Sequence, residues 1–524
     1  MEEVPALREF LEKTTDLLAA AQDGDGYLNS WFQGVLPERR WRDLTWGHEM
    51  YCAGHLIQAG IAASRGAGEG RLLEVARRFA DLLARRFGAQ GEDGICGHPE
   101  IEMALVELYR ETDELSYLDL ATRLVELRGR GILQPDGMGR RYFVDHLPVR
   151  EATEATGHAV RQLYLAAGIT DVYLEGGDGS LLDALQKLWV SAFEEKTYVT
   201  GGQGSRHRDE SFGDPFELPP DRAYAETCAA IASFLWCWRM LLATGHGRYA
   251  DAMERALYNA IAVAVSVDGR HFFYSNPLQL RPGHDGSHED APSRRLEWYS
   301  CACCPPNVAR LVASIQRYVA TEDGDGVQLH LIAQGHVQTS NVELDVRTEY
   351  PWDGRARIEV ARTEGEWTLS VRRPGWCAGG SASSGGEKTV ADELGYFRLR
   401  RRWQPGDVVE VDLPMRTELV RAHPRVDAVR GCGALVRGPL VYCVERDDVD
   451  DLRIDASRLP EPAAGRLAPI VLEGEAGLAS IPAEQPLYGA PSGGTATKTA
   501  LVAIPYFRWA NAAARAMRVW LPLA

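Results

Sequence analysis

Three cysteines lie within four consecutive positions of "WYSCACCPPNVAR", residues 298–310, directly before a Pro-Pro pair. They are Cys301, Cys303 and Cys304, in a chain that contains ten cysteines. Adjacent cysteines are poor disulfide partners, whereas thiolates gathered at one place are good nucleophiles and good ligands for zinc. Burial as small apolar side chains is the alternative that this segment leaves open. A tetrahedral zinc site needs four ligands, so at least one would come from elsewhere in the chain.

A second candidate segment is "YAETCAAIASF", which contains Glu226 and Cys228 at the start of an expected helix. A spacing of two residues places side chains on different faces of a regular α-helix. Both could therefore reach one metal ion only if the backbone at this point is not yet helical. The alternative is a glutamate that complements the helix dipole beside a buried cysteine.

Three histidines each follow a glycine at the head of an expected helix: His48 in "WGHEMYCAGH", His98 in "CGHPEIEMAL" and His158 in "ATGHAVRQLY". A single histidine of this kind is more often a core or surface residue than a ligand. At helix starts, however, imidazoles can line a pit and hydrogen-bond a sugar or a phosphate. Cys52 occupies the position four residues after His48, so the zinc-protease motif is absent.

The fourth candidate is the stretch "GGQGSRHRDESFGDPFELPPDRAYAETC", residues 201–228, which has no periodicity and is rich in acidic residues. A solvated acidic loop is the simplest interpretation. Long irregular segments in compact domains are nevertheless often functional. Aromatic residues and carboxylates together also suit a carbohydrate pocket, with flat faces for stacking and carboxyl groups for hydroxyls and proton transfer. The acidic residues are Asp209, Glu210, Asp214, Glu217, Asp221 and Glu226.

Hydrophobic periodicity divides the chain into a helical part and a strand-rich part. Apolar residues recur at spacings of three and four up to about residue 320, and alternate with polar residues in short runs after "TEDGDG", residues 321–326. We therefore expect about ten helices in an all-α toroid, followed by β-sandwich structure. The Gly/Ser-rich stretches 378–389 and 489–499 predict surface loops. The expected helices lie in 6–21, 49–64, 71–87, 101–112, 117–129, 157–174, 180–196, 226–244, 248–266 and 307–320.

Composition limits the classes of partner. The chain has 524 residues, 45% of them hydrophobic and 25% charged, which is typical of globular domains with sizeable cores. A net charge of -17 and a pI near 5.3 argue against a nucleic-acid partner. The N-terminus is acidic and amphipathic, and no later apolar run is expected to approach the ~18 residues that span a bilayer. We expect a cytoplasmic protein with reduced thiols and no membrane partner.

Taken together, these segments resemble glycoside hydrolase family 127, the β-L-arabinofuranosidase family, over essentially the whole chain. The resemblance implies an (α/α)6 barrel catalytic domain followed by β-sandwich domains. We place the barrel at 1–322, a first sandwich at 323–425, which the strands of 500–524 could complete, and a second sandwich-like domain at 426–499. The matching segments are "WGHEMYCAGHLIQAG", "ATGHAVR", "TGGQGSRHRDESFGDPFELPPDRAYAETCAA", "FFYSNPL", "CACCPPNVARLVASI", "RGPLVYCVE" and "VAIPYFRWAN".

The resemblance also implies the site residues and the reaction. Zn²⁺ would be held by Glu226, Cys228, Cys303 and Cys304, and Cys303 would be the nucleophile of a retaining hydrolysis that releases terminal β-L-arabinofuranosyl residues. Glu210 would be the general acid/base. The sugar would be bound by His48, His98 and His158, with Tyr274 as a further contact.

This sequence departs from the family pattern at Asp209, which stands where glycine is expected and could change the pKa of Glu210 or the aglycone side. The sugar is therefore the open point. The alternatives are the hydrolysis of a different rare pentose of pectic side chains and a non-catalytic carbohydrate-binding protein with structural zinc. A dithiol redox or metal-sensing protein is a weaker alternative, because no thioredoxin-like context surrounds "CACC". The expected partner is a small oligosaccharide or glycoside, and a homodimer stays open as an alternative to a monomer.

Overall fold

The computed structural model describes residues 4–281, 295–447, 449, 452–457, 459–462, 465–476, 497–511 and 515–524. The chain divides into two compact units. Unit 1 consists of Met1–Glu194 with Arg208–Phe212, and unit 2 of Glu195–His207 with Gly213–Ala524. The chain thus enters unit 2 at Glu195, returns to unit 1 for Arg208–Phe212, and enters unit 2 again at Gly213.

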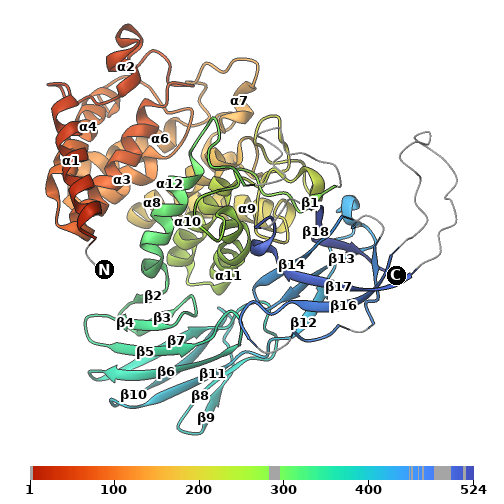
Figure 1. Cartoon of the computed structure of the whole chain (residues 1–524). Coiled ribbons are helices and arrows are strands. Elements are labelled where there is room, and N and C mark those ends of the chain that lie inside the picture. Colours follow the sequence, from red (N-terminus) through yellow and green to blue (C-terminus); the bar gives the residue numbers. More distant parts are fainter. Residues whose placement is uncertain are drawn as a thin grey trace, which may run out of the picture. The chain divides into compact units, whose positions relative to one another are not determined.

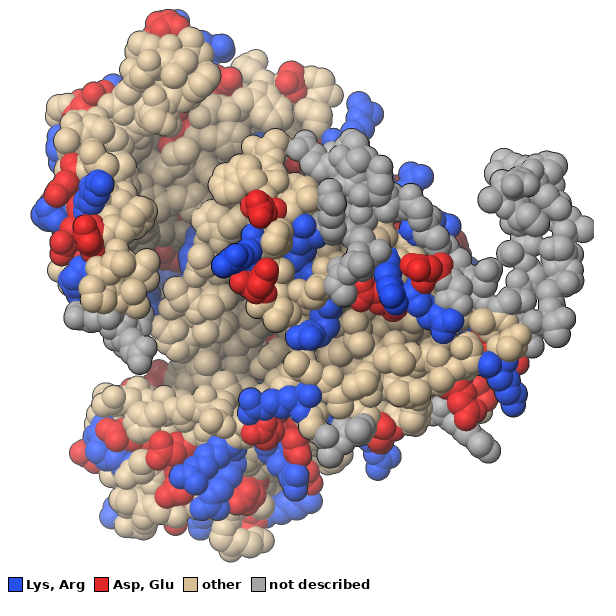
Figure 2. Space-filling view, in the orientation of Figure 1, with Lys and Arg blue, Asp and Glu red and all other residues tan. Residues whose placement is uncertain are grey.

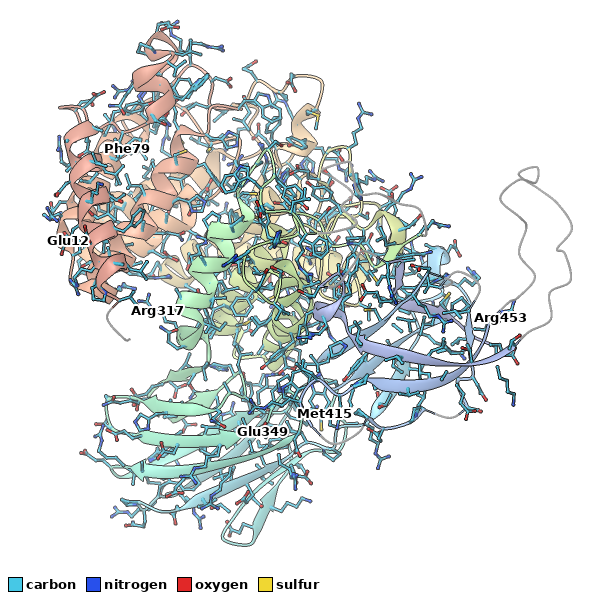
Figure 3. The ribbon with its side chains drawn as sticks, in the orientation of Figure 1. Glu12, Phe79, Arg317, Glu349, Met415 and Arg453 are labelled. Carbon is cyan, nitrogen blue, oxygen red and sulfur yellow. The ribbon has the colours of Figure 1, made fainter. Side chains whose placement is uncertain are left out.

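Unit 1 is helical, as its periodicity predicts (Figure 1). In α4 the apolar residues recur at spacings of three and four, and one of them, Phe79, points into the helical interior (Figure 3). The Phe79 ring packs edge-on against Tyr27 with centroids 5.4 Å apart. The helices are α1 (Pro5–Ala21), α2 (Ser30–Gly34), α3 (Glu49–Ala67), α4 (Gly70–Phe87), α5 (Ile101–Thr112), α6 (Leu115–Leu127), α7 (Gly139–Tyr142), α8 (Ala159–Gly176) and α9 (Gly179–Glu195).

Unit 2 begins with helices α10 (Thr227–Thr244), α11 (Gly247–Arg255) and α12 (Cys304–Ser314), with a π-helix at Ala256–Ile261. Among the described residues, α10 is long and apolar enough to cross a membrane, with a mean hydropathy of 1.4. The expectation that no such run exists is therefore wrong. Because 78% of α10 is buried inside the protein, its composition is that of a core helix.

The middle of unit 2 is a β-sandwich of a four-stranded sheet, β10-β7-β3-β2, and a six-stranded sheet, β4-β5-β6-β11-β8-β9. One apolar core joins them, with Leu369 and Phe397 from the first sheet and Ile358 and Val411 from the second. Figure 2 shows acidic and basic side chains interspersed over this region, on the face in view. The strands are β2 (Ala320–Glu322), β3 (Gly326–Leu329), β4 (Gly335–Gln338), β5 (Glu343–Thr348), β6 (Arg355–Arg362), β7 (Glu366–Arg372), β8 (Ser381–Ser384), β9 (Glu387–Thr389), β10 (Tyr396–Arg402) and β11 (Val408–Asp412).

The C-terminal region forms a nine-stranded sheet. Its β17 pairs with β14 and β16, and β19 with β13, so the strands after 497 do not complete the first sandwich. The reason is the alternation in β17, whose Leu501 and Ala503 share a core with Ile470 and Leu472 of β16. The strands are β1 (Gln279–Leu280), β12 (Thr417–Val420), β13 (Cys432–Arg437), β14 (Leu440–Glu445), β15 (Arg453–Ile454), β16 (Ile470–Ala476), β17 (Thr497–Pro505), β18 (Met517–Arg518) and β19 (Trp520–Pro522).

The two β regions of unit 2 are also joined to each other by polar contacts. Arg437 Nη1 donates to Met415 Sδ at 3.1 Å, and Arg466 pairs with Glu349 at 2.6 Å. Met415 and Glu349 are labelled in Figure 3. These contacts connect the sandwich with the C-terminal sheet.

One low-complexity stretch is not a loop. Residues 381–389 form the hairpin of β8 and β9, and its turn is made by Gly385 and Gly386, both at positive φ. Two adjacent positive φ values are the geometry of a tight hairpin turn, which glycine adopts without strain. In the second stretch, residues 489–496 lie outside the described residues, and 497–499 begin β17.

A buried ionic network connects the helices of unit 2 with its β regions. Arg372 of β7 is fully buried and pairs with Asp251 and Glu254 of α11, the latter at 2.5 Å. In the following π-helix, the Asn259 amide donates to the carbonyl of Pro439 at 2.9 Å. Because α11 packs on α10, these contacts fix the helix that carries part of the site described below.

Candidate functional site

The N-terminus of α10 presents two of the predicted ligands. Glu226 is the N-cap and has an extended backbone, with φ -56° and ψ 140°, whereas Cys228 lies in the first helical turn. This change of backbone conformation is what allows residues two apart to approach one point, as the sequence required. Both side chains are buried.

The N-terminus of α12 presents the other two. Cys303 is its N-cap and Cys304 its first residue. Two prolines follow in the first turn, where backbone N–H groups have no acceptor within the helix, so the N–H that proline lacks costs no hydrogen bond. Cys304 is buried and Cys303 half-buried. Cys301 is exposed and lies outside the four-residue group. Two helix N-termini, each with positive partial charge, thus converge on one set of sulfur and oxygen atoms.

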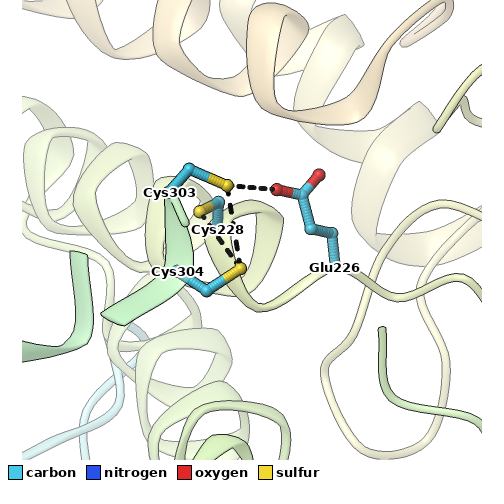
Figure 4. A group of neighbouring side chains, drawn as sticks. All are labelled: Glu226, Cys228, Cys303 and Cys304. Carbon is cyan, nitrogen blue, oxygen red and sulfur yellow. Dashed lines mark hydrogen bonds between the residues drawn. The ribbon is translucent and has the colours of Figure 1, made fainter. Parts of the chain in front are cut away.

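The spacing of these atoms fits a tetrahedral metal ion (Figure 4). Cys228 Sγ lies 3.6 Å from Cys304 Sγ, Cys303 Sγ lies 3.8 Å from Cys304 Sγ, and Cys303 Sγ lies 3.6 Å from Glu226 Oε1. Two sulfurs bound to one tetrahedral zinc at ~2.3 Å would be about 3.8 Å apart, and a sulfur and a carboxylate oxygen about 3.5 Å apart. The donor set and its dimensions are therefore compatible with a metal site.

The pKa values of the three thiols also favour a bound cation. Burial raises the pKa of the Cys228 and Cys304 thiols well above the ordinary value, and contacts with the Cys228 and Cys301 thiols raise the pKa of Cys303. Without a cation all three thiols would be protonated near neutral pH. A divalent cation would supply the charge that makes them thiolates.

Two neighbouring side chains contact the sulfurs. Tyr274 Oη lies 3.5 Å from Cys303 Sγ, and the carbonyl of Tyr274 accepts from Thr227 N at the start of α10. Asn307, one turn after Cys303 in α12, donates through Nδ2 to Cys228 Sγ at 3.0 Å. Tyr274 was expected to contact the sugar, and the structure places it beside the predicted nucleophile. Asn307 was missed, although its position in "CCPPN" places it one helical turn from the cysteines.

The three predicted histidines form a second group, within unit 1. The His48 and His98 rings are 5.7 Å apart, as are the His98 and His158 rings. His158 is the N-cap of α8, where its Nδ1 accepts from Arg161 N. The other nitrogen, Nε2, therefore carries the proton and donates to Glu210 Oε2 at 2.8 Å.

The backbone of Glu210 is fixed against the start of α8. Its carbonyl accepts from Ala159 N at 3.0 Å, and Phe212 N donates to the carbonyl of Gly157 at 2.9 Å. Glu210 has a φ of 54°, in the left-handed region that non-glycine residues seldom occupy. Its side chain is 31% exposed, whereas that of His158 is 7% exposed. The carboxylate is thus held by histidine and stays open to solvent.

Burial lowers the pKa of His48, His98 and His158, most strongly for His98. The nearby guanidinium of Arg161 lowers all three further. Sequence reasoning did not find Arg161, which is buried and donates to the carbonyl of Gly97 at 2.8 Å. At neutral pH the three imidazoles are therefore uncharged. Nδ1 of His48 and Nδ1 of His98 lie against backbone carbonyl oxygens, those of Trp46 and Pro99, and so carry the proton, which leaves Nε2 of each ring as an acceptor for hydroxyl groups.

Three family models match the chain: "Beta-L-arabinofuranosidase, GH127 catalytic domain" at residues 1–317, the GH127 middle domain at 326–415, and the glycoside hydrolase family 127 C-terminal domain at 417–522. The chain belongs to glycoside hydrolase family 127. It is accordingly a glycoside hydrolase, with a helical N-terminal part followed by β-sheet domains.

Relatives cover nearly the whole chain. A non-reducing end β-L-arabinofuranosidase of Bifidobacterium longum subsp. longum is 35% identical over 98% of this chain and 85% of its own length. The crystal structure of a GH127 β-L-arabinofuranosidase from Geobacillus stearothermophilus T6 superposes with a TM-score of 0.94, at 38% identity over 100% of this chain and 88% of that one. A GH127 β-arabinofuranosidase superposes with a TM-score of 0.89, at 31% identity over 99% of this chain and 85% of that one.

Proposed function

We propose that this family 127 hydrolase removes terminal β-L-arabinofuranosyl residues with retention of configuration, with Cys303 as nucleophile and Glu210 as general acid/base. The observation that carries the proposal is the set of three sulfurs and one carboxylate at tetrahedral spacing, in which Cys303 is the least buried cysteine. The two arabinofuranosidase relatives support the choice of sugar.

The metal is proposed to be Zn²⁺, since three sulfurs and one carboxylate are a donor set that zinc prefers. Glu226, Cys228, Cys303 and Cys304 would hold it. When bound, zinc would keep the Cys303 thiol deprotonated at neutral pH.

In the first step Cys303 Sγ forms a bond to the anomeric carbon as the bond to the leaving oxygen breaks. Glu210 gives its proton to that oxygen. In the second step Glu210, now a carboxylate, takes a proton from water, whose oxygen displaces the Cys303 sulfur. Two displacements restore the original configuration, as in glycosidases with a carboxylate nucleophile.

The remaining residues bind and orient. His48, His98 and His158 are proposed to line the terminal-sugar site as neutral imidazoles, with Nε2 of His48 and Nε2 of His98 accepting hydrogen bonds from the sugar hydroxyl groups. Tyr274 is proposed to contact that sugar while its hydroxyl lies beside Cys303 Sγ. His158 also acts as a positioning residue, because its Nε2–H holds the Glu210 carboxylate.

Family membership also supports the predicted (α/α)6 arrangement of the helical part. A cytoplasmic location is our proposal as well, supported by the ten cysteines, all of them among the described residues and none of them in a disulfide bond.

The test is a panel of p-nitrophenyl furanosides and pyranosides, followed by NMR of the first product formed. We expect the β-L-arabinofuranoside to be the best substrate and the released sugar to appear first as the β-anomer. Preference for another pentose would change the assigned sugar. A product of inverted configuration would contradict the double displacement.

A further inference from the structure

A groove in unit 1 lies beside the histidine group. It is a cavity of about 310 Å³ between α2 and the segment that precedes α3. Two indole rings line it, those of Trp31 and Trp46, which are 53% and 36% exposed. Two aromatic side chains exposed together in a groove are typical of ligand sites.

Short local motifs hold both tryptophans in place. The Asn29 carboxamide accepts from the backbone N–H groups of Trp31 and Phe32, each at 3.1 Å, and so starts α2. On the other side, Asp43 Oδ1 accepts from Trp46 N at 2.9 Å. A side chain at Gly47 would place its Cβ 2.4 Å from the carbonyl oxygen of Asp43, so this turn requires glycine.

The Trp46 ring is also fixed from behind. Phe143 packs edge-on against it with centroids 4.9 Å apart, and the Arg161 guanidinium lies 5.3 Å from its centroid. A ring that is held on one side and partly exposed in a cavity is a preorganised stacking surface.

Trp46 connects the groove with the histidine group. Its carbonyl oxygen is hydrogen-bonded to His48 Nδ1, and Arg161 belongs to the first turn of α8, after His158. An enzyme that removes terminal residues holds the terminal sugar in its pit, and only the leaving-group side of the substrate continues outward. We infer that the groove binds the saccharide unit on the leaving-group side of the scissile bond, an inference that rests on the function proposed above.

The chemistry of the groove suits that occupant. Indole faces stack on the C–H faces of sugar rings, while the exposed Arg39 and the Asp43 carboxylate at its edge can bind hydroxyl groups. The volume lies at the lower end of the ~300–1,000 Å³ typical of small-molecule sites, which suits a short saccharide rather than a long chain.

The test compares kcat/KM for a β-L-arabinofuranosyl disaccharide with kcat/KM for methyl β-L-arabinofuranoside, which has no sugar to place in the groove. Trp31→Ala should lower the ratio of the two values about tenfold, mainly through KM of the disaccharide, as expected for the loss of one stacking contact. Trp31→Phe should restore part of the ratio. Phe10→Ala is the control, because Phe10 is an exposed aromatic residue of unit 1 outside the groove.

A ratio within twofold of wild type in Trp31→Ala would overturn the assignment of the groove and leave the proposed function intact. Equal losses on both substrates would also overturn it, because they would place Trp31 in the terminal-sugar site or in folding. Wild-type protein that hydrolyses neither glycoside would overturn the proposed function, and the assignment of the groove with it.

Discussion

The cysteine cluster of unit 2, which consists of Glu226, Cys228, Cys303 and Cys304, and the histidine group of unit 1 are built in similar ways. They differ in the charge that their side chains need in order to function. Both lie at the starts of helices, α10 and α12 in one case and α3 and α8 in the other. In the cysteine cluster, burial and mutual contact raise the pKa values of the three thiols, whose useful form is the anion. In the histidine group, burial lowers the pKa values of groups whose useful form is neutral.

The difference shows that burial has opposite consequences for the two groups. It favours neutral imidazoles, so the histidine group is ready to bind a neutral sugar with no further partner. Burial disfavours thiolates, so the cysteine cluster depends on a bound cation to become reactive. Variants in the two groups should therefore fail in different ways.

The largest effect is expected for Cys303→Ser, which keeps the position of the nucleophile but replaces sulfur by a hydroxyl that ionises far less readily. We expect kcat/KM to fall by about 10⁴-fold or more. Cys301→Ser is the matched control and should lose far less activity. A cyclophellitol-type electrophile shaped like the substrate should label Cys303 alone in peptide maps. Label on Cys301 or Cys304, or near-normal turnover of Cys303→Ser, would show that another sulfur reacts.

Glu210→Gln should give a loss that depends on the leaving group. We expect kcat/KM to fall about 10³-fold for an alkyl glycoside but only about tenfold for an activated aryl glycoside, which needs little protonation. Asp209→Asn, next to it in the chain, is the control and should lose less on both. Equal losses on both substrates in Glu210→Gln would indicate that Asp209 or Glu217 is the acid.

Metal content should separate the two groups directly. Wild-type protein purified without chelator should contain about one zinc per chain, and the double variant Cys228→Ala, Cys304→Ser less than about a tenth of that, by elemental analysis. Its unfolding temperature should also fall, because the stabilisation by bound metal is lost. Cys237→Ala, a buried cysteine of α10 outside the group, should retain its zinc. Full zinc in the double variant would exclude this site.

The smallest expected effect is on the stability of the protein at acidic pH. Because burial lowers the pKa of His98, the unfolded chain binds a proton near pH 6.5 that the folded protein does not. The stability that this contributes is fully present above pH 6.5 and is lost as the pH falls below it. Between pH 7.5 and 5.5 the unfolding temperature of wild type should therefore fall about 2 °C more than that of His98→Asn. Equal decreases would show that His98 titrates normally in the folded state.

Much of the fold could be predicted from local pattern. The helices of unit 1 follow apolar spacings that α4 illustrates from Leu72 to Phe87. The change to alternation after 326 likewise marks sandwich strands such as β5 and β6, although β2 precedes it. Strand partners could not be predicted, because alternation fixes which face is buried but not which strand lies beside it. Thus β3 pairs in parallel with β7, and β17 pairs with β14 and β16. The Gly-rich 381–389 hairpin was mistaken for a loop because its strands are short and polar.

For the site, the sequence by itself determined the chemical types: clustered thiols before two prolines, a carboxylate at a helix start, and histidines after glycines. Only the tertiary structure decided that Cys228 and Cys304, 76 residues apart, lie with sulfurs 3.6 Å from each other. It also decided which nitrogen of His158 faces Glu210, and it brought Asn307 to Cys228. Residue types and helix starts depend on neighbours in the chain. Distances between helix starts depend instead on how α10 and α12 pack, which is set by side chains far from the ligands.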